Sequence, residues 1–410
     1  DVVKVGEQSR YYEQSLYKLG WSQFKLAWYE DSLSPFFDLL DRKIKGKDIS
    51  YEEPRFPGLS RADNELVGDT FRVLSIGFSY LDGAETIDTV MAQRGAPEYA
   101  WFVYENLGNL YLEKERFQDA AQTYEAFARQ DPYHERAPAL QAKAIDAYKN
   151  GGFPSLVLDG KRDFVERYGM DGPYWERHAR ADNEAVVGLL KSGLGDLAQY
   201  YHAEAQKTGQ RENFTQAAYW YRKTLDYFPG EPDSATTNFL LAESLFDSGR
   251  YDEAVTEYEA TAYNYPSNAK SAEAAYAAIL AYREHEKTLA GTDKTAWHQA
   301  YLDSGLRFAD TYPNHAESGA VLTTIADDLF KQNEFDLAIR VGEAVVGKQP
   351  PVAPENARTA WTVIAHSHFD LERFGEAERA YYSLRTVMPR NDAQAYREVT
   401  ERIASSIYKQ

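Results

Sequence analysis

The stretch Tyr104-Glu105-Asn106-Leu107-Gly108-Asn109-Leu110-Tyr111 decides the fold, together with Phe117, Ala120, Tyr124 and Pro132 that follow it. Small residues at positions 108 and 120 let two antiparallel helices approach closely. Tyr111 and Tyr124 have the size to fill the space between neighbouring hairpins. Pro132 ends the second helix, because proline cannot donate a backbone hydrogen bond. The stretch therefore predicts one helical hairpin.

The same spacing recurs along the chain, with three further clear copies and several partial ones. The clear copies are Leu241-Ala242, Leu245, Tyr251, Ala254, Tyr258 and Pro266; Ile325-Ala326, Leu329, Phe335, Ala338 and Pro350; and Trp361, Ile364-Ala365, Phe374, Ala377, Tyr381 and Pro389. Looser copies lie around Leu16, Leu19-Gly20, Phe24, Tyr29 and Phe36, around Phe214, Ala217, Tyr221 and Pro229, and before Tyr312-Pro313. The repetition predicts an all-α protein, one continuous right-handed α-solenoid over residues 1–410 with about six to eight hairpins.

This pattern of aromatic, Leu-Gly, Tyr, Ala, Phe and closing Pro resembles the tetratricopeptide repeat, with Tyr104 where that repeat usually has tryptophan. Segments such as Gly249 to Ala254, followed by Tyr265-Pro266-Ser267, look like repeats of bacterial cell-envelope proteins, including outer-membrane assembly and division-coordination lipoproteins. The resemblance implies a non-catalytic scaffold that binds proteins. It also implies a periplasmic or outer-membrane-associated location, and we expect any targeting segment to be absent from this chain.

Three regions depart from the regular pattern. Residues 42–61 are rich in charge and predict a loop insertion, and residues 151–175, with several glycines, predict a degenerate repeat or a loop. In residues 393–410, Tyr396, Val399, Ile403 and Ile407 follow helical spacing and predict a capping helix. If the natural chain continues, that face would stack on another repeat. Self-association through incompletely capped solenoid ends is therefore a further expectation.

Acidic residues outnumber basic ones by 64 to 45, which gives a formal net charge of −19. This balance disfavours nucleic acid and anionic membrane surfaces as main partners, because binding to phosphates depends on positive charge. It favours protein partners with basic segments, although an acid excess also keeps an extended surface soluble. No apolar run reaches the roughly 18 residues that a membrane-spanning helix needs.

The chain has no cysteine, which excludes disulfides, thiolate metal sites and cysteine nucleophiles. His366 and His368, the closest histidine pair, lie two residues apart on a predicted helix and so point in diverging directions. We find no metal-binding, phosphate-binding or nucleophile motif, and therefore expect no enzyme, no cofactor and no metal. A glycosidase or transglycosylase is the lesser alternative, because the separation of two catalytic carboxylates cannot be read from a sequence.

The first helix of each hairpin lines the groove in tetratricopeptide arrays, so the resemblance implies that exposed residues of these helices contact the partner. They form an acidic, aromatic groove. The expected partner-binding residues are Phe102, Glu105, Asn106, Asn109, Glu113, Phe239, Glu243, Phe246, Asp247, Thr323, Asp327, Phe330, Thr362, His366 and Phe369.

The groove resembles the family's chaperone-tail clamp only in part. Asn106 and Asn109 keep the amides of that clamp, whereas Glu105 stands where a positive side chain would be needed. Because Glu105 would repel a carboxylate, we expect a basic or neutral ligand held with aromatic anchors.

Two alternatives stay open for the aromatic residues. The 31 tyrosines and 7 tryptophans could stack on a polysaccharide or on peptidoglycan. Alternatively, the aromatic residues of the first helices pack between hairpins, as helical aromatic stripes usually do. This second interpretation applies to Phe239, Phe246, Phe330 and Phe369.

Overall fold

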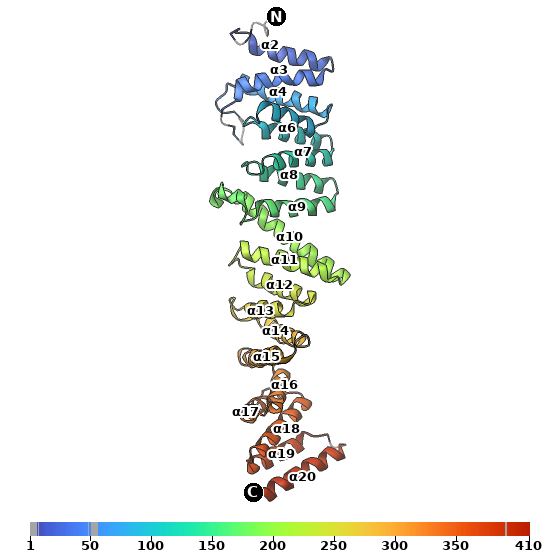
Figure 1. Ribbon diagram of the computed structural model, residues 1–410, viewed down its shortest axis with the longest axis vertical. Coiled ribbons are helices and arrows are strands. Elements are labelled where there is room, and N and C mark those ends of the chain that lie inside the picture. Colours follow the sequence, from blue (N-terminus) through green and yellow to red (C-terminus); the bar gives the residue numbers. More distant parts are fainter. Residues whose placement is uncertain (1–5, 7, 48, 51–55, 390–391) are drawn as a thin grey trace. The chain divides into compact units, whose positions relative to one another are not determined.

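The computed structural model describes residues 6, 8–47, 49–50, 56–389 and 392–410, and every regular element within these ranges is helical. The chain divides into two compact units, residues 1–197 and residues 198–410. The boundary falls inside the long helix α10 (Glu184–Thr208). Figure 1 follows the succession of helices in each unit.

Unit 1 contains eight complete α-helices and two short 3₁₀ turns within the described residues, and it ends in the first part of α10. They are α2 (Tyr12–Lys25), α3 (Tyr29–Ile44), α4 (Arg61–Ser79), α5 (Ala84–Arg94), α6 (Ala100–Glu113), α7 (Phe117–Gln130), α8 (Ala137–Asn150), α9 (Pro154–Tyr168), η1 (Pro173–Glu176) and η2 (Arg180–Asp182).

Unit 2 begins with the last part of α10 and contains ten further helices in the residues described. They are α11 (Arg211–Tyr227), α12 (Ser234–Ser248), α13 (Tyr251–Tyr263), α14 (Ser271–Glu286), α15 (Gly291–Thr311), α16 (Ser318–Lys331), α17 (Phe335–Val346), α18 (Pro354–Asp370), α19 (Phe374–Val387) and α20 (Ala393–Lys409).

Consecutive helices pack against each other as hairpins. Taking each described helix at most once and staying within one unit, seven hairpins can be assigned: α2/α3, α6/α7, α8/α9, α12/α13, α14/α15, α16/α17 and α18/α19. The all-α class and the repeated hairpin are thus confirmed, and the number lies within the predicted range. The continuous solenoid over residues 1–410 stays a prediction.

Six of these hairpins turn in the same way. A residue with positive φ lies two positions before the second helix, and the next amide donates to the carbonyl five residues earlier, as Arg116 does to Tyr111 at 2.8 Å. This bond satisfies a carbonyl that the end of the first helix leaves free. The residues with positive φ are Ala27, Glu115, Gly152, Gly249, Asn333 and Glu372.

Gly108 allows the closest helix approach, as the sequence predicts. A Cβ atom at this position would lie 2.3 Å from Cε1 of Tyr124, far inside van der Waals contact. Tyr124 is fully buried and its hydroxyl donates to Asn109 Oδ1 at 2.8 Å. Tyr111 reaches the neighbouring hairpin, where a Cβ atom at Gly83 would lie 2.9 Å from the Tyr111 hydroxyl oxygen. Tyr111 therefore packs outside its own hairpin, as predicted, whereas the close contact of Tyr124 lies within its own hairpin, against Gly108.

Two of the three irregular regions contain more helix than the word loop suggests. Residues 42–44 complete α3 and residue 61 begins α4, while residues 48 and 51–55 lie outside the described part of the chain. Residues 154–168 form α9, and η1 follows it.

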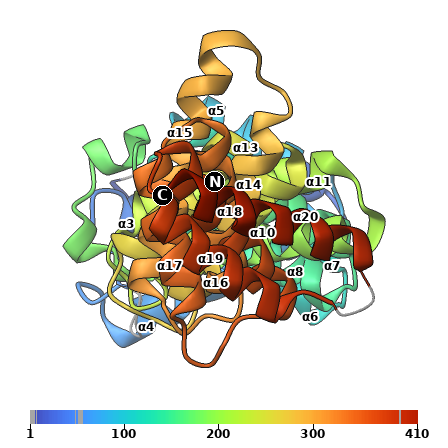
Figure 2. The same cartoon turned by 90° about the horizontal axis from the view of Figure 1, so that it is seen from below.

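At the C-terminal end of unit 2, α20 lies beside α18 and α19 (Figure 2). Its Val399 and Ile403 are buried in one core cluster with Tyr381 and Leu384, whereas Ile407 stays half exposed. Asp392 accepts a hydrogen bond from the amide of Ala395 at 3.1 Å and so caps the start of this helix.

Candidate functional site

In unit 1, the expected contact residues on α6 do not form an open groove. Phe102 and Glu105 are buried, at 8% and 3% exposure, and Asn106 is half-buried and donates to the carbonyl of Phe102 at 2.7 Å. Asn109 and Glu113 are exposed. The expected exposure of Phe102 and Glu105 is therefore wrong, because α6 packs against helices on both sides.

Glu105 takes part in an internal ion pair instead of presenting a charge to a ligand. Its Oε1 lies 2.7 Å from Nζ of Lys143 and 3.4 Å from the guanidinium of Arg136. The Arg136 guanidinium lies 4.6 Å from the ring centre of Trp101, a cation–π distance. The negative charge of Glu105 is thus compensated within unit 1. The structure therefore gives no reason to expect that Glu105 repels a carboxylate ligand.

The expected residues on α12 in unit 2 are better exposed, apart from Phe239. Phe239 is 2% exposed and packs edge-on against Tyr258 at 5.8 Å, so the alternative interpretation of this residue as core is confirmed. Phe246 is half-buried against Tyr251 at 5.2 Å. Glu243 is half-buried and Asp247, one turn further along the same face, is exposed.

Glu243 and Asp247 carry uncompensated charge. Among the described residues, neither carboxylate forms an ion pair or a side-chain hydrogen bond. Desolvation raises the pKa of both, and neighbouring Lys270 and His202 only partly oppose this effect. A cationic group placed between them would therefore gain a favourable interaction that the protein itself does not supply.

The expected residues on α16 are mostly occupied by neighbours. Thr323 is 5% exposed and donates to the carbonyl of Gly319 at 2.7 Å, so its expected exposure is wrong. Asp327 pairs with Lys331 at 2.6 Å. Phe330 is half-buried against Phe335, with ring centres 5.6 Å apart. This helix presents little unused binding capacity.

On α18, the expected residues Thr362, His366 and Phe369 are all half-buried. Phe369 is covered by the cationic ends of Arg402 and Lys409, at 5.2 and 4.7 Å from its ring centre. Thr362 and His366 line a pocket of about 630 Å³ between α18, α19 and α20. The sequence missed the other polar residues of this pocket, because their register on α20 relative to α18 depends on packing.

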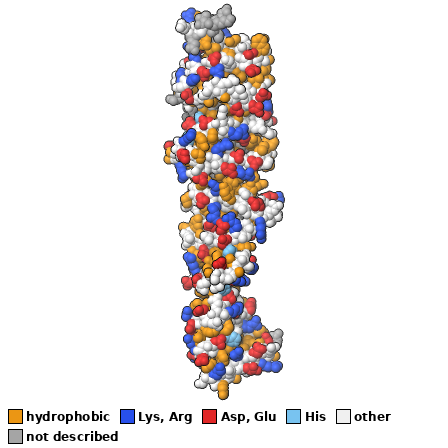
Figure 3. Space-filling view, viewed as in Figure 1, with side chains coloured by type: hydrophobic (Ala, Val, Ile, Leu, Met, Phe, Trp, Pro, Cys, Tyr) orange, Lys and Arg blue, Asp and Glu red, His pale blue; other side chains and the backbone are white. Residues whose placement is uncertain are grey.

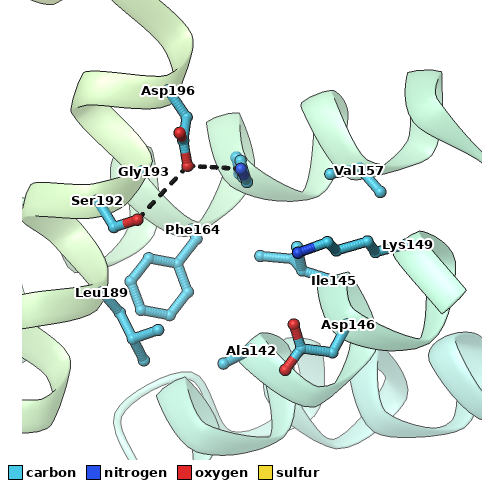
Figure 4. Close-up of a pocket in the computed structure, with 11 residues that line it drawn as sticks. Ala142, Ile145, Asp146, Lys149, Val157, Phe164, Leu189, Ser192, Gly193 and Asp196 are labelled. Atoms are coloured by element: carbon cyan, nitrogen blue, oxygen red, sulfur yellow. Dashed lines mark hydrogen bonds and ion pairs between the residues drawn. The ribbon is translucent and has the colours of Figure 1, made fainter.

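A smaller pocket of about 200 Å³ lies in unit 1 between α8, α9 and the first part of α10 (Figure 4). Ile145, Phe164 and Leu189 surround it with apolar side chains. At its edge, Lys161 pairs with Asp196 at 2.6 Å. The sequence did not indicate this pocket, since its walls come from three helices without a shared motif.

The described surface carries charges of both signs. On the face drawn in Figure 3, acidic and basic side chains are interspersed with hydrophobic ones. In the parts of the chain that the structure describes, no group of three His, Asp or Glu residues is placed to hold a metal ion. Within the same residues, no helix combines the length and apolar character that crossing a membrane requires.

His366 and His368 have different neighbours, as their helical spacing predicts. The ring of His366 lies between those of Phe330 and Tyr381, at 6.0 and 5.6 Å. Nδ1 of His368 is buried and has no hydrogen-bond partner in the described structure. Burial lowers the pKa of both imidazoles, so both are neutral at neutral pH.

Comparison with known proteins identifies one family and distant structural neighbours. A family model described as "Tetratricopeptide repeat" matches residues 84–135, 202–269 and 323–395. A search of curated proteins finds no match.

Two similar solved structures are both of tetratricopeptide type. The complex of the TPR2AB domain of yeast Sti1 with pHSP90 is 14% identical, with 75% of this chain and 98% of that chain covered and a TM-score of 0.29. A tetratricopeptide repeat protein from Parabacteroides merdae is 11% identical, with the same two coverages and a TM-score of 0.23. The three segments that match the family model thus contain tetratricopeptide repeats, and the helical hairpins described above agree with this assignment.

Proposed function

We propose that the protein is a non-catalytic scaffold that binds a lysine- or arginine-containing segment of a partner protein on α12 of unit 2. The observation that carries this proposal is the pair of carboxylates Glu243 and Asp247. They lie one helical turn apart without an ion-pair partner among the described residues, and desolvation raises the pKa of both. A cation binding there would stabilise the ionised form of each carboxylate.

The surroundings of the two carboxylates favour a peptide over a free ion. Phe246, the residue directly before Asp247 in α12, is half-buried and offers an apolar contact beside the charge. Lys270 pairs with Glu273 at 2.6 Å and lies 4.6 Å from the ring centre of Phe239, and it forms no ion pair with either carboxylate. An extended segment with a basic and an apolar side chain would use both features at once.

The test compares two labelled, capped peptides that alternate phenylalanine with either lysine or glutamine. We expect the lysine peptide to bind and the glutamine peptide not to bind. The Glu243→Gln/Asp247→Asn variant should bind the lysine peptide about tenfold more weakly than the wild type, which corresponds to about 1.4 kcal/mol. The double variant should also be somewhat more stable thermally than the wild type, because it removes two desolvated charges.

The matched control is Asp252→Asn/Asp293→Asn, which removes the same charge from two exposed positions in the first turns of α13 and α15. It should leave the affinity for the lysine peptide within about twofold, since exposed charges at a distance are screened by salt. Equal losses in both double variants would mean that only net charge matters, and the proposed site would be abandoned.

The proposal includes placement of the scaffold in a bacterial cell envelope, at the periplasm or the outer membrane. It is supported by the likeness of the segment from Gly249 to Ala254 to repeats of envelope proteins. Fractionation of cells that produce the full-length protein tests it, and recovery only in the cytosolic fraction would contradict it.

A second candidate function is polysaccharide binding, which one observation in unit 1 favours. Tyr29 and Tyr80 are stacked at 4.6 Å with an interplanar angle of 10°. Tyr80, at the end of α4, and Trp28, in the turn between α2 and α3, are 63% and 56% exposed, so both present aromatic surface. Binding of peptidoglycan fragments that is lost in Trp28→Ala would favour this function over the peptide scaffold.

A further inference from the structure

The pocket between α18, α19 and α20 has an apolar floor and a polar rim. Tyr381, Leu384 and Met388 of α19 form the floor, and α18 contributes Arg358, Thr362 and His366 at intervals of four residues. The facing wall comes from α20. Its lining residues are Ala395, Glu398, Val399, Glu401, Arg402 and Ser405.

The pocket contains a buried hydrogen-bond donor without an acceptor. Tyr381 is fully buried, and its hydroxyl has no partner in the described structure. Burial raises the pKa of this phenol to about 12, so it keeps its proton at neutral pH. Tyr381 is one of the residues that line the pocket, and because buried polar atoms are nearly always hydrogen-bonded, its unpartnered hydroxyl points to a missing acceptor.

Two guanidinium groups at the pocket also lack a carboxylate partner. Within the described residues, neither Arg358 nor Arg402 forms an ion pair, although Arg402 lies over the ring of Phe369 at 5.2 Å. Glu398 and Glu401 lie on the same wall, so the pocket has no net positive charge. Recognition of an anion here would depend on positioned donors, unlike the long-range attraction of a basic patch.

We infer that this pocket binds an acidic side chain of a partner polypeptide, with the carboxylate between the two guanidinium groups and the Tyr381 hydroxyl. Leu384, Met388 and Val399 contact the methylene groups of that side chain. Glutamate fits better than aspartate, because its longer stem reaches the apolar floor. The inference rests on the proposed protein-binding function, but it concerns a different site and the opposite charge.

The experiment uses the whole chain and three labelled, capped peptides that alternate leucine with glutamate, glutamine or lysine. We expect the glutamate peptide to bind at least about tenfold more tightly than the glutamine peptide. Arg358→Gln/Arg402→Gln should remove most of that preference while keeping part of each aliphatic stem. Glu398→Gln/Glu401→Gln should raise the affinity for the glutamate peptide, because it removes two like charges.

Tyr381→Phe separates ligand binding from folding. It removes only an unpartnered hydroxyl, so the thermal midpoint should stay equal or rise, whereas the affinity for the glutamate peptide should fall about tenfold. Unchanged affinity in this variant, or equal binding of the glutamate and glutamine peptides to the wild type, would overturn the inference.

The Glu243→Gln/Asp247→Asn variant distinguishes this inference from the proposed function. It should bind the glutamate peptide like the wild type and lose the affinity for the lysine-containing peptide. Loss of glutamate-peptide binding in this variant would overturn the inference of a separate site on the last hairpin, whereas failure of the lysine peptide alone would count only against the proposed function.

Discussion

Gly108 is the position where a single atom decides the packing of a hairpin. Because its Cβ would lie 2.3 Å from the ring of buried Tyr124, we expect Gly108→Ala to destabilise the protein by about 1 to 3 kcal/mol. Gly188 in α10 is the matched control, since it is exposed and nothing lies within 4 Å of its Cβ direction. Gly188→Ala should stabilise the helix by about 0.5 to 1 kcal/mol.

Urea denaturation of the two variants measures both effects. A neutral Gly108→Ala would mean that α6 and α7 separate easily, and that close approach is not what fixes this hairpin. Equal destabilisation by both substitutions would instead point to a helix effect without any role for Tyr124.

At this scale, the sequence predicted the close packing around Gly108 and missed the ion pairs between hairpins. The roles of Gly108 and Tyr124 could be read from spacing, because the two residues belong to adjacent helices. The sequence pattern predicts Glu105 to line the groove, since its neutralising partner, Lys143, lies 38 residues further along the chain. No local pattern marks such a pair, so its charge looked available.

Among the helices, α20 has one face that is buried in the core and another that is exposed to solvent, so substitutions on the two faces should differ in their effect on stability. Ile403 is 4% exposed within the core cluster of the last hairpin, whereas Ile407, one turn later, is 50% exposed. We expect Ile403→Ala to cost about 2 to 5 kcal/mol. Ile407→Ala should stay within about 0.5 kcal/mol of the wild type.

Hydrogen exchange in α18 to α20 measures this difference locally. Faster exchange in Ile403→Ala but not in Ile407→Ala is the expected result, because only the first leaves a cavity against Tyr381 and Leu384. If both variants exchange alike, the predicted capping role of α20 is not supported.

The hairpins could be predicted as elements, but their turns could not. Repeated small and aromatic residues reveal helices that pack at short distance. The left-handed turn residues carry no comparable signal, because Ala27, Glu115 and Glu372 occupy positions where glycine is usual. The short helix α5 also lacked a signal, since only Ile87 and Met91 of its residues are buried.

For the whole molecule, buried histidines make stability depend on pH. Burial lowers the pKa of His134 in unit 1 and of His202, His366 and His368 in unit 2 below the ordinary value of 6.5. The unfolded chain therefore binds these protons more readily as pH falls through 6.5, and the folded state loses stability. We expect the urea midpoint to fall between about pH 7.5 and about pH 6.

Two further results bear on this pH dependence. Replacing His366 and His368 with glutamine should make the urea midpoint depend less on pH.

Glu125 and Glu243 act with the opposite sign. Burial raises the pKa of each above 4.5, so protonation at lower pH removes the desolvation penalty of a buried charge. A midpoint that rises from about pH 7.5 to about pH 6 would show that these carboxylates outweigh the histidines.

The net charge of −19 predicted an acidic surface in general but not where charge would be left unpaired. That outcome depends on contacts. Glu105 and Asp327 are neutralised by lysines, whereas Glu243 and Asp247 are not. The boundary between the units was also invisible, because it lies within the unbroken helix α10.

The shared turn of six hairpins has a consequence for engineering this protein. An L-residue in the left-handed region costs roughly 1 to 2 kcal/mol relative to glycine, and four of the six turns carry a residue other than glycine. Glycine substitutions at these turns would therefore raise the thermal stability of the protein at sites away from the proposed binding residues. Glycine at Glu115 or Glu372 could offset a destabilising change in a binding residue, so that specificity can be redesigned without loss of the fold.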